Sequence, residues 1–429
     1  MKYRLLFFAI STIATGVLNA GGFNLYEFGA RASCMGGTGV AYPWDASTIF
    51  YNPSGIAFLE GTQFYGGLDL VTSKAKFTGN QPILGGTEHE TKENWFTPIH
   101  FYFSQRFNEN LAAGVGVTNP FGLGVEWKDD FPGRIISRSS EIISFYFSPV
   151  VAYALSEGLS VSGGLDVVFS RVELKRSTYI FDSPGSIGYE VAEVTLKGPS
   201  NVGVGFTASL MYKSEKGGIG FMYRHKVKQK FKDGDATFEI FQNLSVPQAV
   251  AIATGALIDQ NVSTELTYPN IAVAGIYHKP FDWFGYEVNV NWFGWSTVDQ
   301  LVLNFSAEDP DDQLPTQTVH LNYSDSWQVR VGVNFKPIEK LDIYGGYIYD
   351  LTPQPIESVG PLLPDANRSD FSIGAGYAMG KFRVDAGAML VNFEERSTVE
   401  DGEGKNDNGF DGTYNSLANL YFLSLGFNL

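Results

Sequence analysis

The chain has 429 residues, a formal net charge of −16 and a single cysteine. This acidity argues against nucleic acid as a partner, and one cysteine excludes an internal disulfide. Aromatic residues make up 15% of the chain and charged residues only 18%, with 48 glycines, which is typical of a β-protein with tight turns and much apolar surface.

Residues 1–20 are predicted to be a secretory signal. Two basic residues precede an apolar run at 5–17, and Leu18-Asn19-Ala20 offers small residues for cleavage. The apolar run is shorter than the ~20 residues that a membrane-spanning helix requires. We therefore expect an exported protein whose mature chain begins at Gly21.

Residues 21–60 are predicted to form a plug, called the hatch below. They are rich in glycine and apolar residues but show neither the alternation of a strand nor the stripe of a long helix. Such a segment cannot build a core alone, and its aromatic residues would form a sticky patch in water, so it needs a container. The residues singled out as hatch residues are Gly22, Phe23, Leu25, Phe28, Asn52 and Pro53.

Asn52-Pro53 is read first as an ordinary turn, because proline fixes φ and asparagine bonds its own backbone. Inside a barrel the same turn would pin the plug. The functional interpretation is therefore that it sets the fold of the hatch and does not contact ligand.

Residues 61–429 are predicted to form the container, an all-β outer-membrane antiparallel β-barrel of about fourteen strands. From Trp327 to Phe335 apolar residues alternate with polar ones such as Arg330, which gives one apolar and one polar face. In a soluble periplasmic β-protein the polar face would meet water, whereas in a barrel the apolar face meets lipid. The predicted strands are 61–72, 95–106, 111–127, 141–154, 159–175, 202–213, 217–232, 262–278, 284–303, 318–336, 341–351, 369–379, 381–396 and 415–429.

The connections between these strands favour the barrel. Tight turns such as 156–158 alternate with long polar loops such as 176–201 and 233–261. Short turns at one rim and long loops at the other are typical of outer-membrane barrels. The last strand, 415–429, is expected to close against the first.

Asn119, Pro120, Phe121 and Gly122 interrupt the third predicted strand. Proline cannot donate to a ladder, and both proline and glycine inside a strand mark bulges or bends. The simpler interpretation is that the strand ends at residue 118. Because alternation resumes at 123–127, we expect a kink that parts neighbouring strands and lets an apolar solute leave sideways into lipid.

No motif predicts an enzyme. The five histidines lie far apart without a metal spacing such as HExxH, and the sequence holds no GxSxG elbow. We therefore expect no catalytic residue, no metal and no cofactor.

Five short segments occur in this order along the chain: Gly22 to Phe28, Tyr51-Asn52-Pro53-Ser54-Gly55, Thr118 to Gly124, Trp295-Ser296 with Gln300-Leu301, and Leu363 to Arg368. Together they resemble the FadL family of long-chain fatty-acid and hydrocarbon transporters. The resemblance implies a fourteen-stranded barrel with an N-terminal hatch. It also implies that a hydrophobic ligand lands between external loops, enters an internal pocket and leaves through a gap at the third strand after the hatch rearranges.

A row of cations is predicted to attract an anionic head group. Its members occupy even-numbered positions of one predicted strand, and apolar residues such as Val227 and Phe231 occupy odd-numbered positions between them. If the apolar side chains face lipid, we expect the cations to face the lumen. The alternative is that lumen acids such as Asp166 or Glu173 neutralise them. The row consists of Arg224, Lys226, Lys228, Lys230 and Lys232.

By resemblance, Arg176 matches a family position that contacts the ligand head group. A second family cation is expected near residues 319–320, where this chain has Val319-His320. The head-group site is therefore assigned to Arg176 together with Lys226, Lys228 and Lys230.

We thus expect a passive outer-membrane transporter of hydrophobic small molecules, foremost long-chain fatty acids. The alternatives are uptake of aromatic or aliphatic hydrocarbons and a barrel that serves a secretion system as a shuttle or scaffold; a plug argues against a general porin. Expected partners are the ligand, outer-membrane lipid with lipopolysaccharide, and the barrel assembly machinery. The predicted division is a signal at 1–20, the hatch at 21–60 and the barrel at 61–429.

Overall fold

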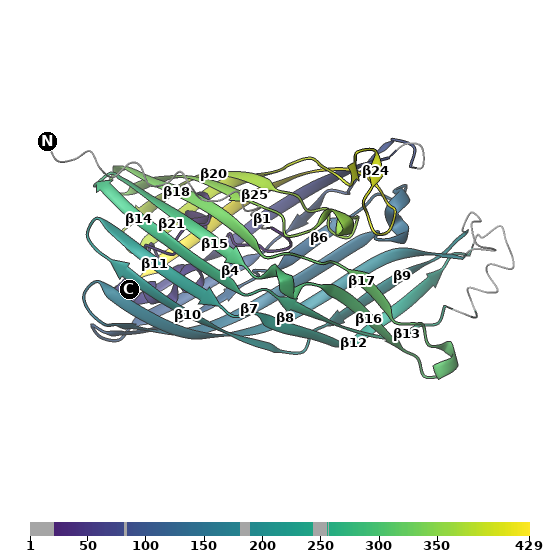
Figure 1. Ribbon diagram of the computed structural model, residues 1–429. Helices are drawn as coiled ribbons and strands as arrows, with labels where there is room; N and C mark the ends of the chain where they lie inside the picture. Colours follow the sequence, from purple (N-terminus) through teal and green to yellow (C-terminus); the bar gives the residue numbers. More distant parts are fainter. Residues whose placement is uncertain (1–20, 81–83, 181–188, 243–254, 256) are drawn as a thin grey trace.

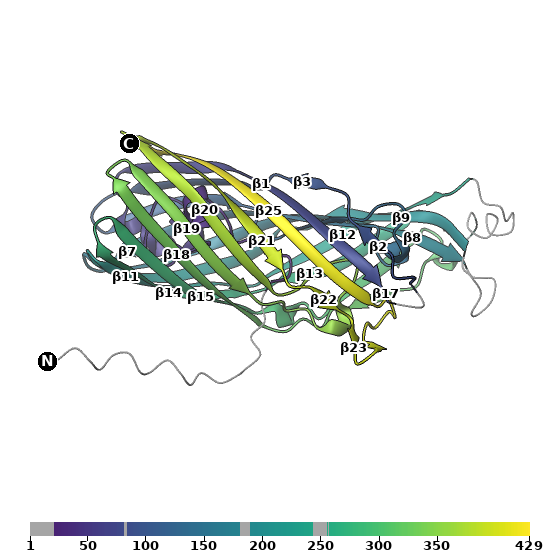
Figure 2. The ribbon, with the colours of Figure 1, turned by 90° about the horizontal axis from the view of Figure 1, so that it is seen from above.

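The computed structural model describes residues 21–80, 84–180, 189–242, 255 and 257–429, which form a β-barrel around a small, partly helical segment. The predicted signal at 1–20 lies outside the described residues. Figures 1 and 2 show the hatch, in purple, inside the half of the barrel that carries the C-terminus and the short turns. None of the described helices is long and apolar enough to cross a membrane.

The hatch contains three short helices, α1 (Ala30–Cys34), α2 (Thr48–Tyr51) and the 3-10 helix η1 (Pro53–Phe58). The wall and its loops follow as β1 (Thr62–Gly79), β2 (Glu88–Glu90), β3 (Asn94–Phe96), β4 (Ile99–Arg106), β5 (Leu111–Thr118), β6 (Gly122–Glu126), β7 (Ser139–Ala154), β8 (Leu159–Ile180), β9 (Tyr189–Pro199), β10 (Gly203–Lys213), β11 (Gly217–Arg224), β12 (Val227–Ile240), β13 (Gln260–Tyr268), β14 (Ile271–Phe281), β15 (Phe284–Phe293), β16 (Gln300–Ser306), β17 (Gln317–His320), β18 (Ser326–Ile338), β19 (Leu341–Asp350), β20 (Arg368–Met379), β21 (Phe382–Phe393), β22 (Arg396–Ser397), β23 (Val399–Glu400), β24 (Glu403–Gly404) and β25 (Gly412–Asn428). Four more 3-10 helices lie in connections: η2 (Pro132–Ile135), η3 (Trp295–Thr297), η4 (Pro310–Asp312) and η5 (Ile356–Ser358).

The first and last strands close the barrel. β1 pairs with β25 in antiparallel register from Gln63↔Asn428 to Gly79↔Gly412. Across the described residues the wall is a closed ladder of fourteen antiparallel strands, as the sequence predicts. Several wall strands are interrupted and therefore carry more than one label, such as β5 with β6 and β11 with β12.

The strands extend further toward the long loops than predicted. The predicted loop at 176–201 is wrong in part, because β8 continues to Ile180 and pairs with β9. The predicted loop at 233–261 likewise begins with the end of β12, which pairs with β9 from Asp235↔Lys197 to Ile240↔Ala192. Above the membrane neither face of a strand meets lipid, so the apolar alternation that marks a strand in the sequence is lost there.

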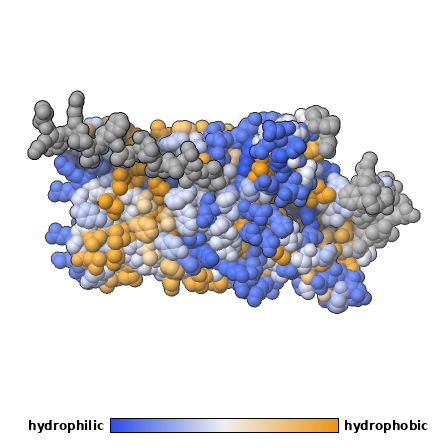
Figure 3. All heavy atoms as spheres, in the orientation of Figure 1, coloured by the Kyte–Doolittle hydropathy of each residue, from blue (hydrophilic) through white to orange (hydrophobic). Residues whose placement is uncertain are grey.

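The alternation predicted for the wall appears as an outer apolar surface. On β18, Trp327 and Phe335 are each 39% exposed, whereas Arg330 between them is 1% exposed. Figure 3 shows hydrophobic residues gathered over the half with the short turns and hydrophilic residues over the half with the long loops. This arrangement gives an outward apolar band for lipid and a polar interior.

Candidate functional site

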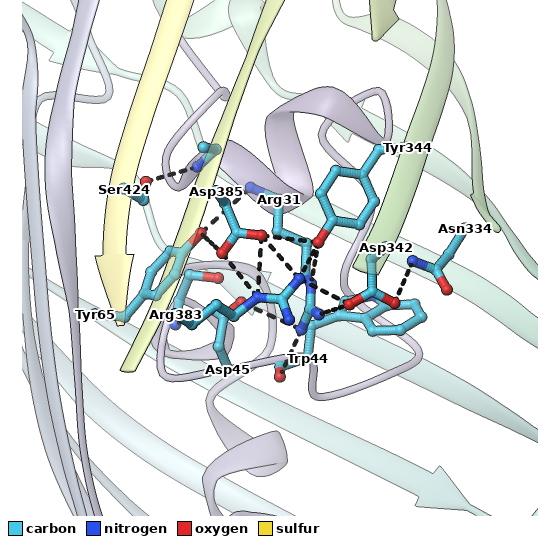
Figure 4. Close-up of polar contacts among 12 residues, drawn as sticks. Arg31, Trp44, Asp45, Tyr65, Asn334, Asp342, Tyr344, Arg383, Asp385 and Ser424 are labelled. Atoms are coloured by element: carbon cyan, nitrogen blue, oxygen red, sulfur yellow. Dashed lines mark hydrogen bonds and ion pairs between the residues drawn. The ribbon is translucent and has the colours of Figure 1, made fainter. Parts of the chain in front are cut away.

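The middle of the hatch is fixed to the wall by a buried charge cluster (Figure 4). Arg31 of α1 donates to Asp342 and to the hydroxyl of Tyr344, both at 3.0 Å, and Arg383 pairs with the same Asp342 at 2.8 Å. Tyr344 in turn donates to Asp385 at 2.8 Å. Removing one partner of a buried ion pair costs about 3–5 kcal/mol because the other charge stays uncompensated. This cluster therefore holds the hatch in place.

Two other buried wall residues, Glu287 and Arg330, also bind the hatch. A carboxylate oxygen of Glu287 accepts the backbone N–H groups of Gly39 at 2.8 Å and Ala41 at 3.1 Å. Arg330 forms an ion pair with Glu27 at 3.2 Å. The lumen face of the wall is thus shaped to hold this segment of the chain.

Asn52-Pro53 lies at a junction between the hatch and the wall. The Asn52 amide donates to the carbonyl of Val40 at 2.6 Å and to that of Leu210 on β10 at 3.0 Å, and its oxygen accepts the Ser54 N–H at 3.1 Å. Neither Asn52 nor Pro53 lines the two cavities described below. The geometry supports a role in the fold of the hatch.

Gly220 on β11 offers a direct test of this packing. A Cβ at this position would lie 1.8 Å from the carbonyl oxygen of Val40, so Gly220→Ala must push the hatch backbone away, at a cost of about 1–3 kcal/mol. We expect the variant to leak ions, measured as single-channel conductance in planar bilayers. Gly163→Ala is the matched control, because nothing lies within 4 Å of a Cβ there. Equal tightness of both variants would contradict the expectation.

The start of the hatch pairs with the interruption in the third strand. The Leu25 N–H donates to the carbonyl of Pro120 at 2.8 Å, and the Gly122 N–H donates to the carbonyl of Phe23 at 3.0 Å. Asn24 and Phe121 form the bridge between these two bonds. The first residues of the hatch therefore act as a short strand laid against the kink.

Gly22 anchors the very start of this segment. Its N–H donates to Asp365 at 2.8 Å, and the same carboxylate accepts the hydroxyl of Thr352 at 2.5 Å. Gly22 has φ +67° and a Cβ there would lie 2.9 Å from the Trp295 ring. Only glycine fits this backbone conformation and this close approach without strain.

Phe23 is surrounded by an aromatic cluster. Its ring centroid lies 4.9 Å from that of Trp295 and 6.0 Å from that of Phe121, and Phe121 stacks on Tyr268 at 4.4 Å. Phe28, by contrast, packs inside the hatch and is 0% exposed. Of the predicted aromatic hatch residues, Phe23 is the one that faces open space.

The wall ladder is broken beside the kink. β4 and β5 pair from Arg106↔Ala112 to Phe101↔Val117, and beyond this point the next bridge across the same boundary is Thr91↔Trp127. In the described part of the wall, β6 pairs with β7 but not with β4. Asn119 spans the start of the gap: its side chain accepts the Ile99 N–H at 3.0 Å and donates to the Ser144 carbonyl at 2.8 Å.

A cavity of about 690 Å³, called the wall cavity, runs through this gap. On the lumen side it is lined by Glu27 and Asp370, and on the lipid side by Trp95 and Phe145. Trp95 is 54% exposed. The lining of the cavity therefore includes residues from the lumen side and from the outer apolar side of the wall. The predicted residues Phe23, Leu25, Asn119, Phe121 and Gly122 all line it.

A second cavity of about 620 Å³, called the loop cavity, lies among the long loops and the upper strands. Its lining is mainly apolar, and Phe23 belongs to it as well as to the wall cavity. Arg176 and His320 reach the same cavity, and Arg176 donates to Gln317 at 2.5 Å. No carboxylate of the described residues forms an ion pair with Arg176.

The lysine row does not face the lumen, so the prediction that placed Lys226, Lys228 and Lys230 at a head-group site is wrong. Arg224 is buried on the lumen side and pairs with Asp166 at 3.3 Å. The chain then leaves the ladder at 225–226. From Val227 to Phe231 in β12 the inward positions are odd-numbered, and the lysines between them are exposed. The interruption reverses which parity points inward.

Two residues beside the gap were not predicted, Pro98 and Phe96. Pro98 faces the kink from the second strand and lines the wall cavity. Phe96 packs against Gly124, where a Cβ would lie 1.9 Å from its ring. Proline in a strand pattern is a signal that could have found Pro98, whereas the contact between Phe96 and Gly124 depends on how two strands meet.

The sequence matches the model of the family described as outer membrane protein transport protein (OMPP1/FadL/TodX) over residues 11–428. The chain belongs to this family. It is therefore an outer-membrane transporter of hydrophobic molecules and not an enzyme.

Relatives of this FadL-type chain cover it almost completely. Outer membrane protein P1 of Haemophilus influenzae is 26% identical, with 97% of this chain and 98% of that protein aligned. The long-chain fatty acid transport protein of Escherichia coli K12 is 22% identical, with 90% of each chain aligned.

Solved structures share the fold of this FadL-type barrel. A Pseudomonas aeruginosa FadL homologue has a TM-score of 0.78 at 19% identity and covers 96% of this chain and 100% of its own. The toluene transporter TodX of P. putida has a TM-score of 0.73 at 16% identity and covers 95% of this chain and 99% of its own.

Proposed function

We propose that this chain carries long-chain fatty acids by passive diffusion from the loop cavity, past Phe23, into the wall cavity and sideways into the membrane at the interrupted third strand. The observation that carries the proposal is the wall cavity, whose lining includes lumen residues and lipid-facing residues. Apolar surface gains roughly 25 cal/mol per Å² on leaving water. A solute that stays in apolar surroundings along this route needs no energy source.

Arg176 supports a fatty acid as the substrate. A carboxylate in a mainly apolar cavity needs a charged or hydrogen-bonding partner. Arg176 offers one that is held only by the neutral Gln317 among the described residues. Guanidinium and carboxylate make short charge-assisted hydrogen bonds. The acyl chain would then lie along apolar residues such as Leu174 and Leu266.

Phe23 is the proposed gate between the two cavities. It lines both of them, and its backbone is held by the hydrogen bond from Gly122. A ligand that takes the place of the Phe23 ring would favour release of the first hatch residues from the kink. The charge cluster around Arg31 would keep the rest of the hatch fixed.

A hydrocarbon substrate is the second candidate, since the cluster of Phe23, Phe121 and Trp295 offers aromatic contacts. Deletion of the gene separates the possibilities. Loss of growth on oleate alone supports fatty-acid transport, and loss of growth on an aromatic hydrocarbon alone supports the second candidate. Normal growth on both would favour a scaffold in a secretion system and contradict either form of transport.

Arg176→Gln is expected to weaken binding of oleate but not of oleyl alcohol. Loss of a hydrogen bond to a charged group costs about 1.5–3 kcal/mol, or roughly ten- to a hundredfold in affinity. Both ligands would be titrated against the purified protein by tryptophan fluorescence. Arg171→Gln is the matched control, because Arg171 lies on the same strand but points outward with its side chain 66% exposed. Equal loss for both ligands would show that Arg176 supports the wall only.

A further inference from the structure

The lysine row, predicted to face the lumen, lies on the outside of the barrel. It stands directly above outward aromatic side chains of the wall. On β11 below it, Phe221 is 47% exposed, and β11 and β12 form one interrupted wall strand. Between them His225 stacks on the outward Phe206, with ring centroids 4.8 Å apart and planes at 15°. Aromatic rings mark the boundary between lipid chains and head groups in such barrels. The exposed lysines directly beyond this boundary are Lys226, Lys228, Lys230 and Lys232.

The wall strand β8, on the far side of β9 and β10 from the row, repeats the same order of side chains. On β8 the outward Phe169 is 47% exposed, and Arg171 follows it on the same face. The segment 200–201 lies between this place and the lysine row: the Ser200 N–H donates to the carbonyl of Ser170, and the Asn201 N–H donates to that of Lys230. Arg171 and Lys230 therefore stand at the same height on either side of one short segment.

Carboxylates neutralise only part of this surface. Glu265 pairs with Lys228 and with Lys230, the latter at 3.7 Å, and Glu173 pairs with Arg171 at 3.4 Å. Within the described residues, no ion pair involves Lys226 or Lys232. Asp233 and Asp235 follow at the far end of the row. The five cations thus outnumber these four carboxylates by one, on a chain whose net charge is −16, and Lys226 at the membrane end of the row has no carboxylate partner among the described residues.

We propose that this cationic surface, formed by Arg171 and the four lysines of the row, binds the phosphorylated glucosamine head group of lipid A in the outer leaflet. The acyl chains would lie against the outward apolar side chains below it, such as Phe206 and Phe221. Two phosphates carry the negative charge that the lysines complement, because basic side chains near an anionic lipid surface are attracted to it. This proposal is independent of the transported substrate.

Lipid A binding can be measured by native mass spectrometry of the purified full-length barrel in detergent micelles. Bisphosphoryl lipid A, monophosphoryl lipid A, dephosphorylated lipid A and phosphatidylglycerol would be titrated in turn. We expect bisphosphoryl lipid A to bind most tightly, monophosphoryl lipid A less tightly and dephosphorylated lipid A least tightly. Equal retention of dephosphorylated lipid A would overturn the proposal, and so would a phosphatidylglycerol affinity as high as that of bisphosphoryl lipid A, which would indicate a general anion surface.

Substitutions test the surface itself. Replacement of the four lysines of the row by Gln is expected to lower the affinity for bisphosphoryl lipid A by at least about tenfold. The matched control removes four cations near the short turns instead, and it should bind as the parent does. Its positions are Lys216, Lys279, Lys336 and Lys340.

The substitution Glu265→Gln is expected to raise the affinity for lipid A, the opposite of the effect of removing the lysines. It frees Lys228 and Lys230 from their carboxylate, so lipid A should bind more tightly even if the fourfold variant fails to fold. Heat-modifiable migration on a gel would report folding of every variant. Unchanged affinity in Glu265→Gln, or in a folded fourfold variant, would overturn the proposal.

Discussion

Deletion of residues 21–55 is expected to give a barrel that still folds but conducts ions freely. The ladder closes through β1 and β25, so each wall strand keeps its neighbours without the hatch. The hatch lies inside the half of the barrel with the short turns (Figure 2), and most of its residues are buried there. Its removal leaves a water-filled passage where a plugged one stood.

The wall can tolerate this deletion because water replaces the lost partners. Arg330 and Asp342 lose their ion pairs to Glu27 and Arg31, and Glu287 loses two backbone donors. In a dry core such losses would be severe. In an open lumen these groups become hydrated, so the large penalty for a buried, unpaired charge does not arise.

Two measurements decide the outcome of the deletion. Heat-modifiable migration on a gel reports whether the barrel folds, and single-channel conductance in a planar bilayer reports whether it is open. The full-length barrel and Gly163→Ala serve as closed references. An unfolded product, or one as tight as the parent, would show that residues 21–60 are not a plug within an independent wall.

The barrel could be predicted because its signal is local. Lipid outside and polar groups inside impose a period of two on each strand, and residues 326–336 carry it without interruption. The interruption at 119–122 was also visible, since Pro120 removes a ladder donor whatever surrounds it. The alternation of short turns with long loops between the strands then predicts an outer-membrane barrel.

The lysine row shows where such reasoning fails. Even or odd position in the sequence predicts which side of the wall a side chain faces only while the strand stays in its ladder. The chain leaves the ladder at His225-Lys226, where no proline or glycine marks the interruption. The charge cluster around Arg31 was equally hidden. Its partner Asp342 is more than 300 positions away in the chain, and only the closed barrel brings the two together.

Replacing Pro120 with Val and Gly122 with Thr is expected to block transport while ligand binding in the loop cavity persists. Valine restores a backbone donor, and β-branched residues favour a continuous ladder. The third strand could then pair with the second across the present gap and narrow the wall cavity. Oleate uptake by cells and oleate binding to the purified protein would be measured on the same variant, and uptake should fall toward the background of a deletion strain.

The opposite edge of the gap sharpens this prediction. Pro98 also lacks an N–H, so the two substitutions can restore only part of the ladder, and adding Pro98→Val should lower uptake further. Amide hydrogen exchange at 93–98 and 119–126 would show how much of the ladder has formed. Pro149→Val is the matched control, because Pro149 pairs with Val115 in the intact part of the wall, and its uptake should stay normal. Normal uptake in a variant whose gap amides have become protected would rule out lateral exit.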